Sequence, residues 1–158
     1  MKTLIVGLGN PILSDDGIGI RVAQAVADTK RVTDSNVEFV EASLGGLALA
    51  ERLQGYDRVI LVDAIQTCGG KPGAVYRLSL DDVPTRHADS IHDASLKTAL
   101  EVFRHHGGHI PSQITIIALE AVNLLNFETL TPEVEAAIPS AVEAVLAELE
   151  VSNGHGRS

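Results

Sequence analysis

The chain is short of cysteine and of positive charge. It has one cysteine, Cys68, in 158 residues, and a single cysteine cannot form an intramolecular disulfide, so we expect a reducing, cytoplasmic location. Only 12 lysines and arginines stand against 21 aspartates and glutamates, which gives a net charge of −9. Because nucleic acids and anionic membrane surfaces are bound mainly by basic side chains, this balance disfavours both as partners.

Long apolar runs are also absent. No run approaches the ~20 apolar residues of a membrane span, and no basic segment precedes the first apolar run as it does in a signal peptide. The length suits one domain, and the 45% apolar and 21% charged residues are ordinary for a soluble protein. We therefore expect a single domain over residues 1–151. Residues 152–158 are polar and contain glycine, which predicts a disordered tail.

Three apolar segments are rich in β-branched residues and lack the regular polar alternation of a half-exposed strand. Strands buried on both faces have this pattern, which indicates a mostly parallel sheet covered by helices. Weaker strand patterns and helical patterns alternate with them. We therefore expect an α/β three-layer sandwich, in which helices cover both faces of a twisted sheet of about five strands. The predicted strands are 3–6, 37–41, 58–62, 74–80 and 114–119, and the predicted helices are 17–27, 46–54, 94–106 and 133–150, the last bent or broken at Pro139.

The most informative segment is IVGLGNPILSDDGIG, residues 5–19. It has the pattern of a buried strand, a tight glycine turn and two adjacent carboxylates between further glycines. A strand followed by glycines commonly cradles a phosphate, because glycine lets backbone N–H groups approach an anion. Asp15 and Asp16 stand where that anion would lie and would repel it. The segment is therefore better suited to a cation, although the glycines by themselves need only permit a tight turn and close helix–strand packing.

Three other kinds of site are less well supported. A dinucleotide site needs G-x-G-x-x-G, and Ile12 stands at the third glycine position, although Glu41 fits the acidic residue expected after the second strand. We therefore predict no bound nucleotide cofactor. No G-x-S-x-G elbow for a nucleophilic serine is present. Cys68 has no neighbouring histidine in the sequence, which is more typical of an incidental loop thiol than of a nucleophile.

Asp63 and His92 are further candidates for a cation site. Ligands of open α/β sheets bind beyond the carboxyl ends of the strands, and Asp63 directly follows the apolar run 59–62. A buried aspartate there is costly unless it is paired, hydrogen-bonded or metal-bound; it would equally suit the cap of a loop or a helix. His92 stands at the start of the predicted helix 94–106, from which it could face the same edge. With Asp16 these residues form a mixed oxygen and nitrogen set that suits zinc or nickel.

The other histidines have simpler explanations. His105, His106 and His109 cluster near the end of a predicted helix, where they would complement the helix C-terminus at the surface. His87 lies in a polar segment and His155 in the predicted tail, so neither is assigned a role.

Taken together, these segments resemble one known family, the hydrogenase maturation endopeptidases, which process the large subunit of nickel–iron hydrogenases. The matching pieces keep their order and spacing over residues 3–149, so the resemblance covers nearly the whole chain. Each piece alone is a weak signal, and the combination is specific. They are Gly7-x-Gly9-Asn10, Asp15-Asp16-Gly17-x-Gly19, Val62-Asp63-Ala64, Pro72-Gly73, Ser90-x-His92 followed by Leu96, and Leu130-Thr131-Pro132.

The resemblance implies that Asp16, Asp63 and His92 are the catalytic and metal-contacting residues. We expect Asp15 and Asn10 to be supporting residues and assign neither a definite role. Nickel would then belong to the substrate, the hydrogenase large-subunit precursor, from which a C-terminal peptide is removed. A metal-polarised carbonyl or metal-activated water would drive the hydrolysis, and the resemblance leaves the general base unassigned. Ligands of one metal must converge within roughly 5 Å of a shared point.

Two observations leave alternatives open. Many family members carry Asp-Gly-Gly-Thr-x-Gly after the second strand, whereas residues 41–46 are Glu-Ala-Ser-Leu-Gly-Gly, which leaves the hydrogenase class undetermined. Residues 4–11 also resemble the opening of bacterial peptidyl-tRNA hydrolases. Those enzymes carry a catalytic histidine soon afterwards, but the first histidine here is His87, and a tRNA substrate would demand a basic surface. A non-catalytic nickel-binding chaperone is the other alternative, and the retained carboxylate–imidazole set argues against it.

Overall fold

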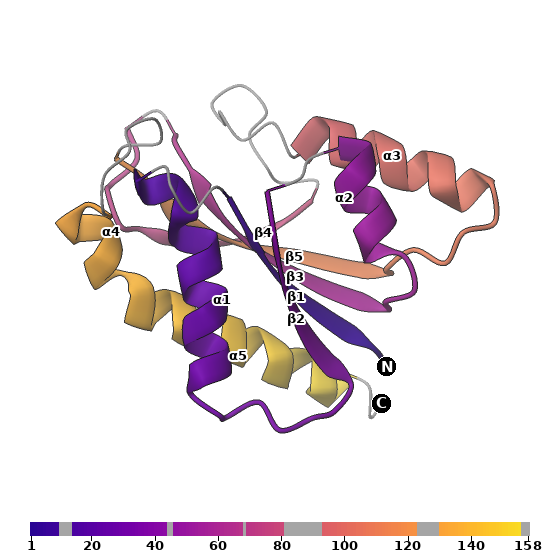
Figure 1. Ribbon diagram of the computed structural model, residues 1–158, viewed down its shortest axis with the longest axis horizontal. Helices are drawn as coiled ribbons and strands as arrows, with labels where there is room; N and C mark the ends of the chain where they lie inside the picture. The colour runs from indigo at the N-terminus through magenta and orange to yellow at the C-terminus, as the bar shows by residue number, and fades with distance from the viewer. Residues whose placement is uncertain (10–13, 44–45, 68, 81–92, 123–129, 156–158) are drawn as a thin grey trace.

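The middle layer of the molecule is a five-stranded sheet (Figure 1). The computed structural model describes residues 1–9, 14–43, 46–67, 69–80, 93–122 and 130–155. The strands are β1 (Thr3–Leu8), β2 (Val37–Ala42), β3 (Arg58–Ile65), β4 (Val75–Ser79) and β5 (Gln113–Glu120). They lie in the order β2-β1-β3-β5-β4, and all pairs are parallel except β4 with β5. This confirms the predicted mostly parallel sheet.

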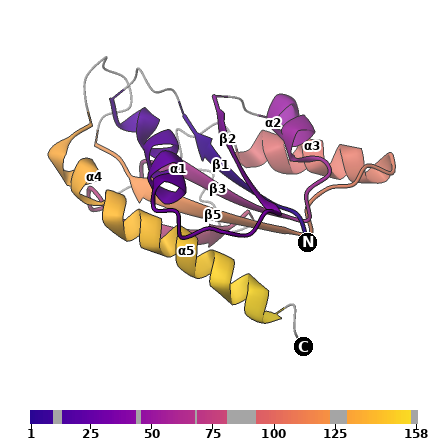
Figure 2. The same ribbon diagram turned by 60° about the horizontal axis from the view of Figure 1, so that its bottom comes forward.

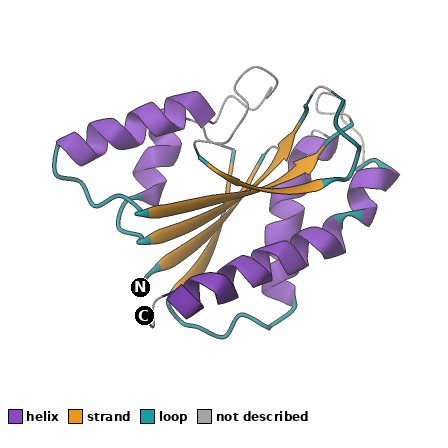
Figure 3. Ribbon diagram, turned by 180° about the vertical axis from the view of Figure 1, so that it is seen from behind, coloured by secondary structure: helices purple, strands orange, loops and turns teal. Residues whose placement is uncertain are grey.

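Helices cover both faces of this sheet. They are the 3-10 helix η1 (Ser14–Gly17) and the α-helices α1 (Ile18–Asp28), α2 (Gly46–Leu53), α3 (Asp93–His105), α4 (Pro132–Ala136) and α5 (Ile138–His155). Helices α1, α4 and α5 lie on one face and α2 and α3 on the other (Figures 1 and 2), and Figure 3 shows the same layers from behind. The predicted three-layer sandwich is therefore confirmed. No helix in the described part of the chain is long and apolar enough to cross a membrane.

The last helical segment is interrupted at the place that Pro139 predicts. Helix α4 ends at Ala136 and α5 begins at Ile138, so the proline lies in the first turn of α5, where its missing N–H costs no helical hydrogen bond. Helix α5 extends to His155 and so continues through the first residues of the segment that we assigned to the tail. Residues 156–158 lie outside the described part of the chain.

Two apolar cores on the two sides of the sheet explain why the central strands show no polar alternation. Successive residues of a strand point to opposite faces, and in β3 both faces are buried. Asp63 belongs to the series that faces α2 and α3, together with Val59, Leu61 and Ile65, while Ile60, Val62 and Ala64 face α1 and α5. The strand therefore presents Asp63 to the face covered by α2 and α3.

The crossovers of the chain change direction between β1 and β3. Helix α1 connects β1 to β2 on one face, and α2 connects β2 to β3 on the other. At such a switch point the connections leave a crevice at the carboxyl ends of the two strands. Strands β1 and β3 pair only as far as Gly7 and Val62, after which β3 continues beside β5. Helix η1, which follows β1, contacts β3.

Gly19 lets α1 begin directly against the backbones of β1 and β3. A Cβ atom on Gly19 would lie 2.2 Å from the carbonyl oxygen of Val62 and 2.4 Å from that of Leu8, which no side chain can tolerate. Gly7 of β1 packs equally closely against α1, because a Cβ atom on Gly7 would lie 2.7 Å from the carbonyl oxygen of Gly19. These two glycines therefore serve close helix–strand packing, as one interpretation of the motif predicted.

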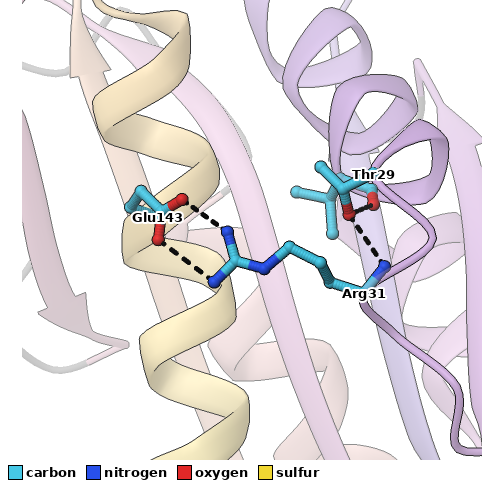
Figure 4. Close-up of polar contacts among 4 residues, drawn as sticks. Thr29, Arg31 and Glu143 are labelled. Atoms are coloured by element: carbon cyan, nitrogen blue, oxygen red, sulfur yellow. Dashed lines mark hydrogen bonds and ion pairs between the residues drawn. The ribbon is translucent and has the colours of Figure 1, made fainter.

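Polar contacts join the other end of α1 to α5 (Figure 4). Nη1 and Nη2 of Arg31 lie 2.6 and 3.4 Å from the two carboxylate oxygens of Glu143. The backbone N–H of Arg31 donates to Oγ1 of Thr29 at 3.2 Å, and that hydroxyl donates to the carbonyl oxygen of Val26 at 2.6 Å. Both side chains of the ion pair are more than half exposed, so we expect it to contribute little to stability.

Candidate active site

Asp63 lies at the switch point between β1 and β3, but its place in the strand differs from the prediction. The sequence suggested that the strand ends at Val62, whereas β3 continues to Ile65 and Asp63 pairs with Ala118 of β5. The strand continues because Ala64 and Ile65 are also buried and also pair with β5. Asp63 is thus the first residue of β3 beyond its pairing with β1.

The carboxylate of Asp63 is buried and is held by the backbone beside it. The residue is 6% exposed, and Oδ1 accepts a hydrogen bond from the N–H of Ala64 at 2.8 Å. The next element along the chain is β4, so Asp63 does not cap the start of a helix. It supplies a carboxylate near the carboxyl ends of the strands, where open α/β folds bind their ligands.

Of the two other predicted site residues, the structure describes the backbone of Asp16 alone and does not describe His92. Asp16 belongs to η1, which follows β1 and lies against β3, but its side chain is outside the described part of the structure. His92 is also outside it, and α3 begins at the following residue, Asp93. Within the described ranges, no group of three or more His, Cys, Asp or Glu residues could hold a metal ion. The convergence of the three residues therefore stays a prediction.

Asp15, to which the sequence gave no definite role, is fully buried. Its carboxylate accepts hydrogen bonds from the backbone N–H of Val122 at 2.9 Å and of Thr131 at 2.8 Å. The hydroxyl of Thr131 donates to the same carboxylate, with oxygen–oxygen distances of 3.0 and 3.2 Å. Asp15 thus connects η1 to the end of β5 and to the start of α4.

Glu120 is a buried carboxylate at the same edge that the sequence analysis did not single out. It ends β5 and is 2% exposed. It accepts hydrogen bonds from the N–H and the hydroxyl of Thr67, at 2.8 and 2.5 Å, and from the hydroxyl of Tyr76 at 3.0 Å. Burial, and then the hydrogen bond to Glu120, raise the pKa of Tyr76. The signal that identified Asp63 was an acidic residue directly after an apolar run. Glu120 directly follows the run 114–119, so the same signal could have identified it.

The donors around Glu120 make it an anchor for the connection between β3 and β4. Gly70 lies over the carboxylate so closely that a Cβ atom there would fall 1.9 Å from Oε1. The backbone N–H of Gly73 donates to the carbonyl oxygen of Glu120 at 2.9 Å. Glu120 therefore holds the backbone of this connection at Thr67 and Gly73.

The cluster of histidines near the end of α3 has the surface role that the sequence predicted. His105, His106 and His109 are exposed. A ring nitrogen of His106 lies 2.8 Å from the carbonyl oxygen of Val102, in the last turn of α3, and Nε2 of His109 lies 3.1 Å from Oδ1 of Asp57. Four other residues discussed from the sequence, Asn10, Ile12, Cys68 and His87, lie outside the described part of the chain.

Comparison with known proteins assigns the family. A model of the hydrogenase maturation protease family matches residues 20–148. The hydrogenase 2 maturation protease of Escherichia coli (strain K12) is 31% identical over 154 residues, which cover 96% of this chain and 93% of that protein. The hydrogenase expression/formation protein HupD of Rhizobium leguminosarum bv. viciae is 29% identical, covering 92% of this chain and 72% of that protein.

The fold agrees with this assignment. The solved structure of the hydrogenase maturating endopeptidase HybD from E. coli superposes with a TM-score of 0.82 at 31% identity, and the match covers 96% of this chain and 94% of that one. The HybD [NiFe] hydrogenase maturation protease of Thermococcus kodakarensis superposes with a TM-score of 0.65 at 25% identity. The resemblance noted in the sequence is thereby confirmed, and the chain belongs to the hydrogenase maturation protease family.

Proposed function

We propose that this protein is an endopeptidase that removes a C-terminal peptide from the nickel-loaded large-subunit precursor of a nickel–iron hydrogenase. The observation that carries the proposal is the position of Asp63, a buried carboxylate at the switch point between β1 and β3. Helix η1, which contains Asp16, also contacts β3. Family membership supplies the type of reaction, and the single cysteine supports a cytoplasmic setting.

In this proposal nickel belongs to the substrate, and Asp16, Asp63 and His92 contact it. Two carboxylates and one imidazole suit a borderline divalent metal and leave coordination positions open for the precursor's own ligands. The metal polarises the scissile carbonyl or activates a water molecule. The protein's part is to hold its donors at a defined edge, and for Asp63 the described contact is the hydrogen bond from the N–H of Ala64.

The alternatives from the sequence have less support. A peptidyl-tRNA hydrolase would need a basic surface, whereas the net charge is −9, and the relatives described above are a hydrogenase maturation protease and a hydrogenase expression/formation protein. A nickel-binding chaperone without catalytic activity would bind the loaded precursor and leave its length unchanged, so the experiment below separates it from a protease.

The proposal is tested with purified protein and a panel of large-subunit precursors, each prepared with and without nickel. We expect mass spectrometry to show loss of a C-terminal peptide from a loaded precursor and no change in the nickel-free form. Cleavage of both forms at the same rate would contradict the role of nickel. Failure to shorten any loaded precursor would contradict the protease assignment, and stable binding without cleavage would favour the chaperone.

A further inference from the structure

Asp15 joins three segments that are far apart in the sequence and that meet at the edge of the sheet proposed to bind nickel. Its hydrogen-bond partners, Val122 and Thr131, are 107 and 116 residues away. Val122 follows β5, and Thr131 is the residue that caps the N-terminus of α4. One fully buried carboxylate therefore sets where η1 lies relative to β5 and α4.

The contacts are those that a buried carboxylate needs. A buried charge is tolerated only when hydrogen bonds replace its lost hydration, and Asp15 receives two backbone N–H groups and one hydroxyl. The N–H of Thr131 gains as well, because it lies at the start of α4, where backbone N–H groups have no partner within the helix. The side chain of Thr131, the usual source of such a cap, makes no capping hydrogen bond in α4 and donates to Asp15 instead.

Asp16 is the next residue of the same short helix. Helix η1 has only four residues and contains both aspartates, so it has little hydrogen bonding of its own to keep it in one place. Anchoring the carboxylate of Asp15 fixes the backbone from which Asp16 extends.

We propose that Asp15 is a positioning residue for the hydrogenase-precursor reaction: it holds η1 where Asp16 can contact the nickel of the substrate. This rests on the proposed function. Asp15 itself is directed into the protein, with its carboxylate engaged by Val122 and Thr131, and it acts through Asp16. The two neighbouring aspartates thus have different tasks.

The test compares Asp15→Asn with a variant that loses a buried carboxylate elsewhere. Glu148 is the matched control, because it is 5% exposed and accepts hydrogen bonds from Arg77 and Thr115, near the opposite end of β5. We expect both Asp15→Asn and Glu148→Gln to lower Tm. Well below Tm, Asp15→Asn should lower kcat for a nickel-loaded precursor at least tenfold, while Glu148→Gln should leave kcat unchanged.

Thr131 provides a milder pair of variants that test the same contact. Thr131→Ser keeps the hydroxyl and should retain kcat, whereas Thr131→Val removes it and should lower kcat. If Asp15→Asn does not fold, the Thr131 pair still tests the contact. Wild-type kcat in folded Asp15→Asn or in Thr131→Val would overturn the positioning role. Asp16→Ala separates the two proposals. Retained cleavage in Asp16→Ala would contradict the proposed site. If Asp16→Ala loses cleavage and Asp15→Asn keeps wild-type kcat, only the role of Asp15 is contradicted.

Discussion

Arg77 in the edge strand β4 and Glu148 in α5 form a bidentate ion pair. Nε and Nη2 of Arg77 donate to the two oxygens of Glu148 at 2.6 and 3.0 Å. Glu148 also accepts from the hydroxyl of Thr115 at 2.8 Å. Burial alone raises the pKa of Glu148, but these hydrogen bonds outweigh it, so that the pKa lies below its ordinary value. The pair ties α5 to the antiparallel edge strand.

Glu148 therefore makes the free energy of unfolding depend on pH in the acidic range. Because its pKa is lower in the folded than in the unfolded protein, its contribution is complete above the unfolded pKa and is lost as the pH falls through the folded pKa. We expect Glu148→Gln to lower the free energy of unfolding at neutral pH by about 1–3 kcal/mol. Urea denaturation at several pH values should show a smaller loss of stability on acidification in Glu148→Gln than in the wild type. Equal losses would contradict this assignment.

Gly19 should tolerate no side chain, because α1 contacts the strand backbone there. In Gly19→Ala the new methyl group would overlap the carbonyl oxygens of Val62 and Leu8, so the helix must shift. We expect a loss of more than about 2 kcal/mol in the free energy of unfolding. The exposed Ala27, near the end of the same helix, is the control, and Ala27→Ser should change stability by less than about 0.5 kcal/mol. Similar denaturation curves for the two variants would refute the close packing.

Tyr76 reports on the anchor at Glu120. The chain has two tyrosines and no tryptophan, so absorbance can follow tyrosine ionisation directly. Burial is the main cause that raises the pKa of both Tyr56 and Tyr76, and a hydrogen bond to a glutamate adds to it in each case. We expect both to ionise above the ordinary tyrosine pKa of about 10 in the folded protein.

The Glu120→Gln variant should lower the pKa of Tyr76 and leave that of Tyr56 in place. Tyr76→Phe assigns the two titration steps, and it should cost about 0.5–1.5 kcal/mol of stability for the lost hydrogen bond. A Tyr76 titration that is the same in the wild type and in Glu120→Gln would show that the contact is absent in solution.

Asp63 should be essential for cleavage and dispensable for the fold. Asp63→Asn removes the charge but keeps an oxygen that can accept the N–H of Ala64. We expect kcat/KM for a nickel-loaded precursor to fall by more than about a hundredfold with little change in Tm. Asp57→Asn, at the residue that precedes the other end of the same strand and is only partly buried, should keep full activity. Full activity in Asp63→Asn would contradict its contact with nickel.

Local sequence patterns were sufficient for most of the architecture. The apolar runs at residues 3–6, 58–62 and 114–119 predicted strands that form the middle of the sheet, because burial on both faces favours apolar residues at successive positions and removes the polar alternation of a half-exposed strand. Pro139 predicted the break between α4 and α5, since a proline fits the first turn of a helix and disrupts its interior. These features depend on neighbouring residues alone.

The roles of individual carboxylates depended on tertiary structure. The sequence placed Asp15, Asp16 and Asp63 near one edge of a sheet, but it placed Asp63 after its strand rather than within it. Only the pairing of β3 with β5 beyond the end of β1 decided that position.

The sequence likewise did not distinguish Asp15 and Glu120, which anchor the fold, from the carboxylates that are proposed to contact nickel. Both are held by donors from distant segments, Val122 and Thr131 for Asp15 and Thr67 and Tyr76 for Glu120. The sequence by itself determined which segments are buried and where carboxylates follow them, because burial and chain direction are local properties. Tertiary structure decided which carboxylates anchor the fold, because only long-range contacts bring their donors within hydrogen-bonding distance.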